Sequence, residues 1–142
     1  MILGMVKRGA RRGCDNIACM KGVGVDIIEI ERVRAALDRH GDRFIRHVFL
    51  DGEVGYCSTR RDPARHYAAR FAAKEAVVKA LAVKRSMTFL WRDIEIVRNA
   101  DGAPAVRLTG RARKLASARR VRSLKVSLSH SDTHAVAMAT AH

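Results

Sequence analysis

An alanine-rich segment near the middle of the chain, residues 69–81, limits the possible folds more than any other. At roughly 100° per residue it predicts one helix over about 64–81, with Arg70, Lys74, Val77 and Leu81 on one side. A surface helix normally separates its charges from its apolar stripe. Here two cations lie among large apolar side chains, and alanines elsewhere let other backbone segments come close. Because charges at the margin of a core need partners, the pattern favours a buried helix beside an anionic ligand or a metal.

The composition indicates a basic domain with a hydrophobic core. Of 142 residues, 48% are hydrophobic, and the formal net charge is +14. This charge favours acidic partners, which include nucleic acid, anionic membranes, acidic proteins and polyphosphate cofactors. Only 5% of residues are aromatic and no nucleic-acid-binding motif is evident, so a basic nucleic-acid-binding domain remains only an alternative. No apolar run approaches the roughly 20 residues that cross a bilayer, and the cysteines form no disulfide framework, so we expect a cytoplasmic protein.

The chain divides into a basic tail, residues 1–19, which we expect to be loosely ordered, and one domain over residues 20–142. Hydrophobic periodicity and turn residues predict the elements of this domain. In order they are a strand at 22–27, helices at 29–40 and 42–50, a loop at 51–63, the long helix, a basic loop at 83–89, strands at 92–97 and 105–108, a helix at 111–118, and strands at 126–129 and 135–139. Strands joined by short turns predict the α+β class, with an antiparallel sheet packed by the long helix.

Two carboxylates stand out, one in the first predicted strand and one in the long helix. Asp26 ends the first strand, and Glu75 lies one helical turn before Lys79. Each has an ordinary explanation, because Asp26 fits a capping box with Glu29, and Glu75 and Lys79 have the spacing of a helix ion pair. Magnesium, however, often needs only one or two carboxylates, since waters and substrate phosphates complete its shell. Asp26 and Glu75 therefore become the candidate metal ligands, provided that the fold brings them together.

Three motifs, taken in order, resemble the holo-[acyl-carrier-protein] synthases, which are small bacterial 4′-phosphopantetheinyl transferases. They are GVGVDI at 22–27, RFAAKEA at 70–76 followed by Lys79, and VSLSH at 126–130. The resemblance covers about residues 20–139 and implies a 4′-phosphopantetheinyl transferase-like fold. It also implies a reaction of fatty acid biosynthesis, in which phosphopantetheine moves from coenzyme A to a serine of the apo acyl carrier protein and leaves adenosine 3′,5′-bisphosphate.

The same resemblance implies roles for individual residues. Asp26 and Glu75 would hold Mg²⁺ against the pyrophosphate, and Lys79 would contact the reacting phosphate or assist deprotonation of the serine, so that Glu75 and Lys79 are the catalytic candidates. The coenzyme A-binding candidates are Arg70, Lys74, Lys84, Arg85 and His130. The candidates for docking the acidic carrier protein are Arg32, Arg39, Arg43, Phe44 and Arg46. Members of the family typically form trimers with active sites between subunits.

Two positions depart from the pattern of the family. Lys125 stands where a histidine usually precedes VSLSH, and a lysine keeps a positive charge without titrating near neutrality. Residues 82–85, Ala-Val-Lys-Arg, replace a glycine-rich loop whose backbone N–H groups approach phosphate. A degenerate member that binds coenzyme A without transferring its phosphopantetheine is therefore a further alternative.

Overall fold

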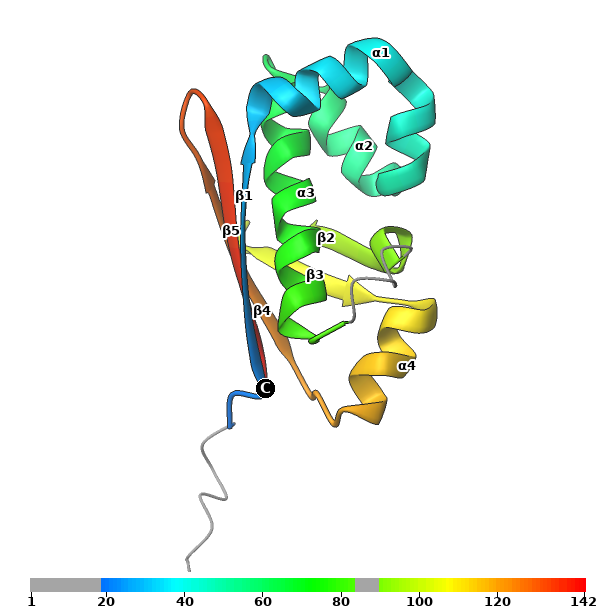
Figure 1. The fold of residues 1–142 in the computed structure, drawn as a ribbon, viewed down its shortest axis with the longest axis vertical. Coiled ribbons are helices and arrows are strands. Elements are labelled where there is room, and N and C mark those ends of the chain that lie inside the picture. The colour runs from blue at the N-terminus through cyan, green and yellow to red at the C-terminus, as the bar shows by residue number, and fades with distance from the viewer. Residues whose placement is uncertain (1–18, 84–89) are drawn as a thin grey trace, which may run out of the picture.

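The chain folds as a long central helix between two antiparallel sheets. The computed structural model describes residues 19–83 and 90–142. The central helix is α3 (Pro63–Ala80), and it packs on a three-stranded sheet in the order β1 (Gly22–Glu29), β5 (His134–Ala141), β4 (Leu124–His130). On the other side of α3 lies the hairpin of β2 (Ile94–Arg98) and β3 (Pro104–Leu108) (Figure 1). The predicted α+β class, with an antiparallel sheet packed by a long helix, is confirmed.

The remaining helices cover the two ends of α3. Helices α1 (Ile30–Val48) and α2 (Asp51–Ser58) lie at one end, and α4 (Gly110–Ala118) lies near the other (Figure 1). One core cluster joins α3 to the sheets and α4, and a second joins the start of α3 to α1 and α2. In the described part of the chain, no helix is long and apolar enough to cross a membrane.

Small residues let β1 and α3 pack backbone against backbone. A Cβ added to Gly22 would lie 2.0 Å from the carbonyl oxygen of Ala80, and one added to Gly24 would lie 2.0 Å from that of Ala76. No side chain fits at such distances, so only glycine allows this approach. The alanine-rich sequence of the long helix thus has the predicted effect, and the close contact fixes β1 relative to α3.

The sequence predicted the kink in α1 but missed α2. Helices were expected at 29–40 and 42–50, and the structure has one helix with non-helical backbone at Gly41, where φ is 45°. Residues 51–63 were expected to be a loop, yet residues 51–58 form α2. The second predicted helix is therefore the last part of α1, and α2 replaces a predicted loop. The basic loop predicted at 83–89 lies almost wholly outside the described residues, as does the tail up to residue 18.

Candidate active site

Asp26 and Glu75 lie in the wall of the same pocket, which is formed by β1, α1 and α3. The pocket has a volume of about 330 Å³, and Arg32, Phe44 and Phe71 also line it. Asp26 comes from β1 and Glu75 from α3, so the close packing of these two elements brings the carboxylates to one place. The fold therefore places both carboxylates in one pocket, as a shared metal would require.

Lys79 reaches across from α3 to β1 instead of pairing with Glu75 on its own helix. Its Nζ lies 2.8 Å from Oδ1 of Asp26 and donates a second hydrogen bond to the carbonyl oxygen of Val25, also at 2.8 Å. The side chain of Lys79 is half exposed, whereas that of Asp26 is mostly buried. A ligand that enters the pocket from solvent thus meets the ammonium group beside the carboxylate.

Glu75 accepts a hydrogen bond from Trp91, a residue that the sequence analysis did not single out. The indole Nε1 lies 2.5 Å from Oε1 of Glu75. Trp91 belongs to a short turn that leads into β2, sixteen positions beyond Glu75 in the sequence. Its only signal in the sequence is that it is the sole tryptophan of the chain.

The two carboxylates suit a magnesium ion that a substrate helps to bind. Among the described residues, no group of three or more His, Cys, Asp or Glu side chains is placed to hold a metal. Within that part of the chain, Oδ2 of Asp26 and Oε2 of Glu75 make no hydrogen bond, so each carboxylate keeps one oxygen for a ligand. Magnesium accepts one or two protein carboxylates when waters and substrate phosphates supply its other ligands. The residues present fit this ion.

Arg70 and His130 belong to a second, basic cluster that surrounds the ring of Tyr56. The guanidinium of Arg70 lies 3.8 Å from the ring centroid, and His66 and His130 continue the cluster with ring centroids 5.7 Å apart. The pKa of His66 is lowered, mainly by burial and then by the neighbouring His130. Arg70 is 5% exposed, and its Nε has no hydrogen-bond partner among the described residues. None of these residues lines the pocket of Asp26 and Glu75.

Lys74 does not fit its predicted role in binding coenzyme A. Its side chain is fully buried, and Nζ lies 2.7 Å from Oε2 of Glu53. The same nitrogen donates to the carbonyl oxygens of Val48 at 2.7 Å and Trp91 at 2.8 Å, which occupies all three of its protons. Burial lowers the pKa of Lys74, and the charge of Glu53 opposes that effect. The sequence could not reveal this partner, because the helix that carries Glu53 was expected to be a loop.

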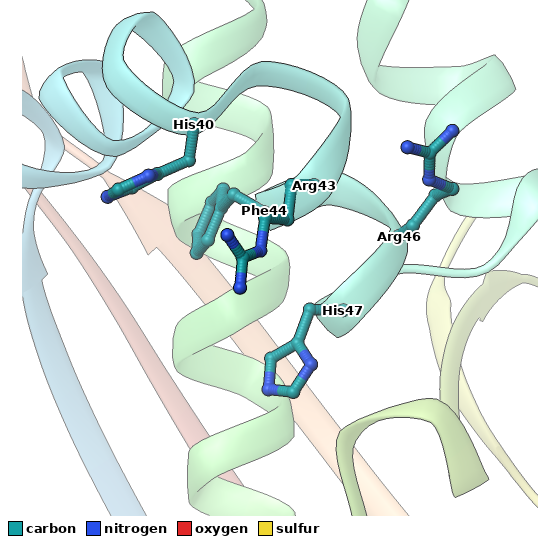
Figure 2. A pocket seen from close by; sticks show the side chains of 5 residues that line it. All are labelled: His40, Arg43, Phe44, Arg46 and His47. Carbon is teal, nitrogen blue, oxygen red and sulfur yellow. The ribbon is translucent and has the colours of Figure 1, made fainter.

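The candidates for carrier docking lie along α1. Arg43, Phe44 and Arg46 line a hollow of about 650 Å³, together with His40 and His47. Figure 2 shows the Arg43 guanidinium near the ring of Phe44, whereas Arg46 extends away from the other four side chains. Phe44 also packs edge-on against two other phenylalanine rings, so it is part of the core as well as of this surface.

The other predicted residues are scattered. Arg32 lines the carboxylate pocket, and Arg39 is exposed on α1. Lys84 and Arg85 lie outside the described residues. Lys125 is exposed on β4. The structure therefore groups Asp26, Glu75, Lys79, Arg32 and Phe44 at the pocket, and it places Arg70 and His130 elsewhere in the same chain.

Comparison with known proteins gives the same family throughout. Residues 22–139 match the sequence model of the 4′-phosphopantetheinyl transferase superfamily. The holo-[acyl-carrier-protein] synthase of Chlorobium limicola is 45% identical over 117 residues, which cover 82% of this chain and 90% of that protein.

Two solved structures agree with this match. The holo-[acyl-carrier-protein] synthase of Helicobacter pylori, in complex with coenzyme A, is 27% identical with a TM-score of 0.72 and covers 84% of this chain and 99% of its own. That of Neisseria meningitidis is 26% identical with a TM-score of 0.75, over 87% of this chain and 98% of its own. The chain therefore belongs to the 4′-phosphopantetheinyl transferase superfamily.

Proposed function

We propose that this chain is a holo-[acyl-carrier-protein] synthase. It transfers 4′-phosphopantetheine from coenzyme A to a serine of an apo acyl carrier protein and releases adenosine 3′,5′-bisphosphate. The observation that carries the proposal is the pocket in which Asp26 and Glu75 face the same space, with Lys79 on Asp26. The names of the related proteins and the coenzyme A complex of one of them support the same reaction.

The residues of the pocket suit phosphoryl transfer, which depends on positioning and on stabilisation of charge. Bound between Asp26 and Glu75, Mg²⁺ would neutralise negative charge on the pyrophosphate. Lys79 is half exposed, so its ammonium group is free to move from Asp26 toward the reacting phosphate or toward the serine hydroxyl. Arg32 of α1 lines the same pocket and adds positive charge there.

We further propose that the active site lies between the subunits of a homotrimer. Arg70, whose buried Nε has no hydrogen-bond partner among the described residues, and His130 suit the phosphates of coenzyme A, yet within one chain they do not line the carboxylate pocket. Assembly would bring this cluster of one subunit to the pocket of its neighbour. The face of the sheet that turns away from α3 supports assembly, because it exposes a group of large apolar side chains: Val23, Val25, Ile27, Val136 and Met138.

The carrier protein is proposed to dock on α1. Arg43 and Arg46 are exposed where they line the hollow beside Phe44, and an acidic protein would complement their charge. The domain is proposed to begin at Met20, since β1 begins at Gly22 and the family match at residue 22. We also propose that the enzyme acts in fatty acid biosynthesis in the cytoplasm.

The test is a transfer assay with three components: coenzyme A, Mg²⁺ and an apo acyl carrier protein. Mass spectrometry of the carrier should show the gain of one phosphopantetheine, and omission of Mg²⁺ should prevent it. Binding of coenzyme A without any gain of mass would instead identify a degenerate member of the family, the alternative that Lys125 raises. Failure to bind coenzyme A would remove the proposal altogether.

A further inference from the structure

The hydrogen bond between Trp91 and Glu75 links the carboxylate pocket to Trp91, a residue that has no role in the proposed transfer reaction. The indole N–H is a donor only, and it points at one oxygen of the carboxylate at 2.5 Å. A hydrogen bond to an ionised group is stronger than one between neutral groups. Glu75 is only partly buried, so without this bond its long side chain would sample several rotamers.

Trp91 is itself held firmly, at its backbone and at its ring. Its carbonyl oxygen accepts a hydrogen bond from the buried Lys74. Its ring lies edge-on to those of Phe71 and His47, with centroid distances of 5.3 and 5.7 Å. These contacts come from α3 and from the end of α1, so the indole N–H is fixed relative to both helices.

Such a donor fixes the direction of the other carboxylate oxygen. When Oε1 of Glu75 is held by Trp91, Oε2 is the oxygen left for a metal in the pocket that Asp26 shares. Groups that hydrogen-bond to a metal ligand orient it, and their loss typically costs roughly 10- to 100-fold in metal affinity. We propose that Trp91 is a positioning residue that holds Glu75 in the orientation needed to bind the divalent cation. This inference rests on the proposed role of Glu75 as a metal ligand.

The sharpest test removes the N–H and keeps the shape of the ring. Trp91 is the sole tryptophan, so biosynthetic replacement of tryptophan by benzothienylalanine changes this position alone. This analogue carries sulfur in place of the N–H group and preserves the ring contacts and the backbone bond to Lys74. Replacement by fluorotryptophan, which retains the N–H, is the matched control. Trp91→Phe is a second variant, encoded genetically, and circular dichroism confirms that each protein is folded.

Metal binding is measured directly with Mn²⁺, which takes the same oxygen ligands as Mg²⁺. The electron paramagnetic resonance signal of free Mn²⁺ gives the Kd with and without coenzyme A, and Glu75→Gln sets the level expected when the ligand itself is lost. We expect the benzothienylalanine protein to bind Mn²⁺ roughly 10- to 100-fold more weakly than the parent, and the fluorotryptophan protein to bind like the parent. In the transfer assay, more Mg²⁺ should be needed for half-maximal rate, while kcat at saturating Mg²⁺ stays near parental.

The two proposals fail in different ways. Unchanged or tighter Mn²⁺ binding by the benzothienylalanine protein would overturn the role of Trp91, even if the parent transfers phosphopantetheine normally. Absence of transfer by the parent, with weaker Mn²⁺ binding in the analogue, would overturn the proposed function and leave the positioning role in place.

Discussion

At the scale of single residues, the ion pair of Lys79 with Asp26 sets the charge balance of the pocket. Asp26 is mostly buried, and its carboxylate lies 2.8 Å from the ammonium group. A second carboxylate, Glu75, lines the same space and is held by a neutral donor, Trp91. Because Arg32 also lines this space, two cations border two carboxylates, and the carboxylate oxygens that make no hydrogen bond among the described residues are the ones left for a divalent ion.

The first prediction concerns these carboxylates. Glu75→Gln and Asp26→Asn remove the charges proposed to hold Mg²⁺, and loss of such electrostatic stabilisation typically costs about 100-fold or more in rate. Each variant should nearly abolish transfer and stay folded. Their double variant should be little worse than either one, as expected for groups that act on one ion. Steady-state rates at limiting Mg²⁺ and thermal unfolding measure both effects. Near-parental transfer by Glu75→Gln would contradict the assignment.

The second prediction concerns the buried pair of Lys74 and Glu53. Lys74→Met would leave the carboxylate of Glu53 buried without its cation, and breaking a buried pair in this way costs about 3–5 kcal/mol. Adding Glu53→Gln removes the stranded charge and keeps an oxygen that accepts the N–H of Ile96, now at 3.0 Å from Glu53 Oε1. Urea unfolding should show a large loss of stability in the single variant and partial recovery in the double variant. A double variant that is less stable than Lys74→Met would contradict this interpretation.

At the scale of elements, the sequence predicts most of what builds the site, and it fails at α2. The apolar run at 22–27, the alanines of α3 and Gly41 are local signals, so β1, α3 and the break in α1 could be inferred. The capping box considered for Asp26 is not formed, because Asp26 lies within β1 and the N-cap residue Glu29 makes no side-chain capping bond.

Helix α2 contains Gly52 and Gly55 and lacks an apolar period. It is held chiefly by Glu53, which caps the helix by accepting the N–H of Leu50 at 2.9 Å and makes tertiary contacts with Lys74 and with the N–H of Ile96. Partners distant in sequence also explain why Lys74 was misassigned and Trp91 was missed.

The third prediction belongs to α1. If the carrier docks on this helix, Arg43→Glu should raise the KM for carrier protein much more than the KM for coenzyme A, and added salt should weaken carrier binding in the parent. The matched control is Arg113→Glu, which makes the same change of charge at an exposed site on α4. Steady-state kinetics with each substrate varied in turn measures the effect. Equal changes in both KM values would place the docking surface elsewhere.

At the scale of the whole molecule, the chain has two groups of candidate site residues, and they do not line a common pocket within one chain. The carboxylate pocket lies between β1, α1 and α3, and the basic cluster of Arg70 and His130 lies around Tyr56. The exposed apolar face of the sheet offers a surface on which copies of the chain would associate. Catalysis would then depend on protein concentration through assembly.

The fourth prediction tests this assembly. Analytical ultracentrifugation should show a trimer for the parent chain and a monomer for Met138→Glu, because a charge in the middle of the apolar face opposes its burial. The monomer should remain folded and lose transfer, since the two groups of site residues no longer meet. Ala100→Glu, at the exposed turn between β2 and β3, is the control and should remain trimeric and active. A monomeric parent with full activity would contradict the shared site.

The contact of Gly22 and Gly24 with the carbonyl oxygens of α3 has a consequence for how this chain tolerates mutation. A methyl group added at either glycine would lie 2.0 Å from the carbonyl oxygen that it faces, and this oxygen belongs to the backbone of α3, which cannot move aside as the end of a flexible side chain can. Gly24→Ala would therefore push β1 from α3 and carry Asp26 away from Glu75. In a mutational library sorted separately for folding and for transfer, Gly24 should tolerate fewer substitutions under selection for transfer than under selection for folding. The large apolar residues of the core should show no such difference.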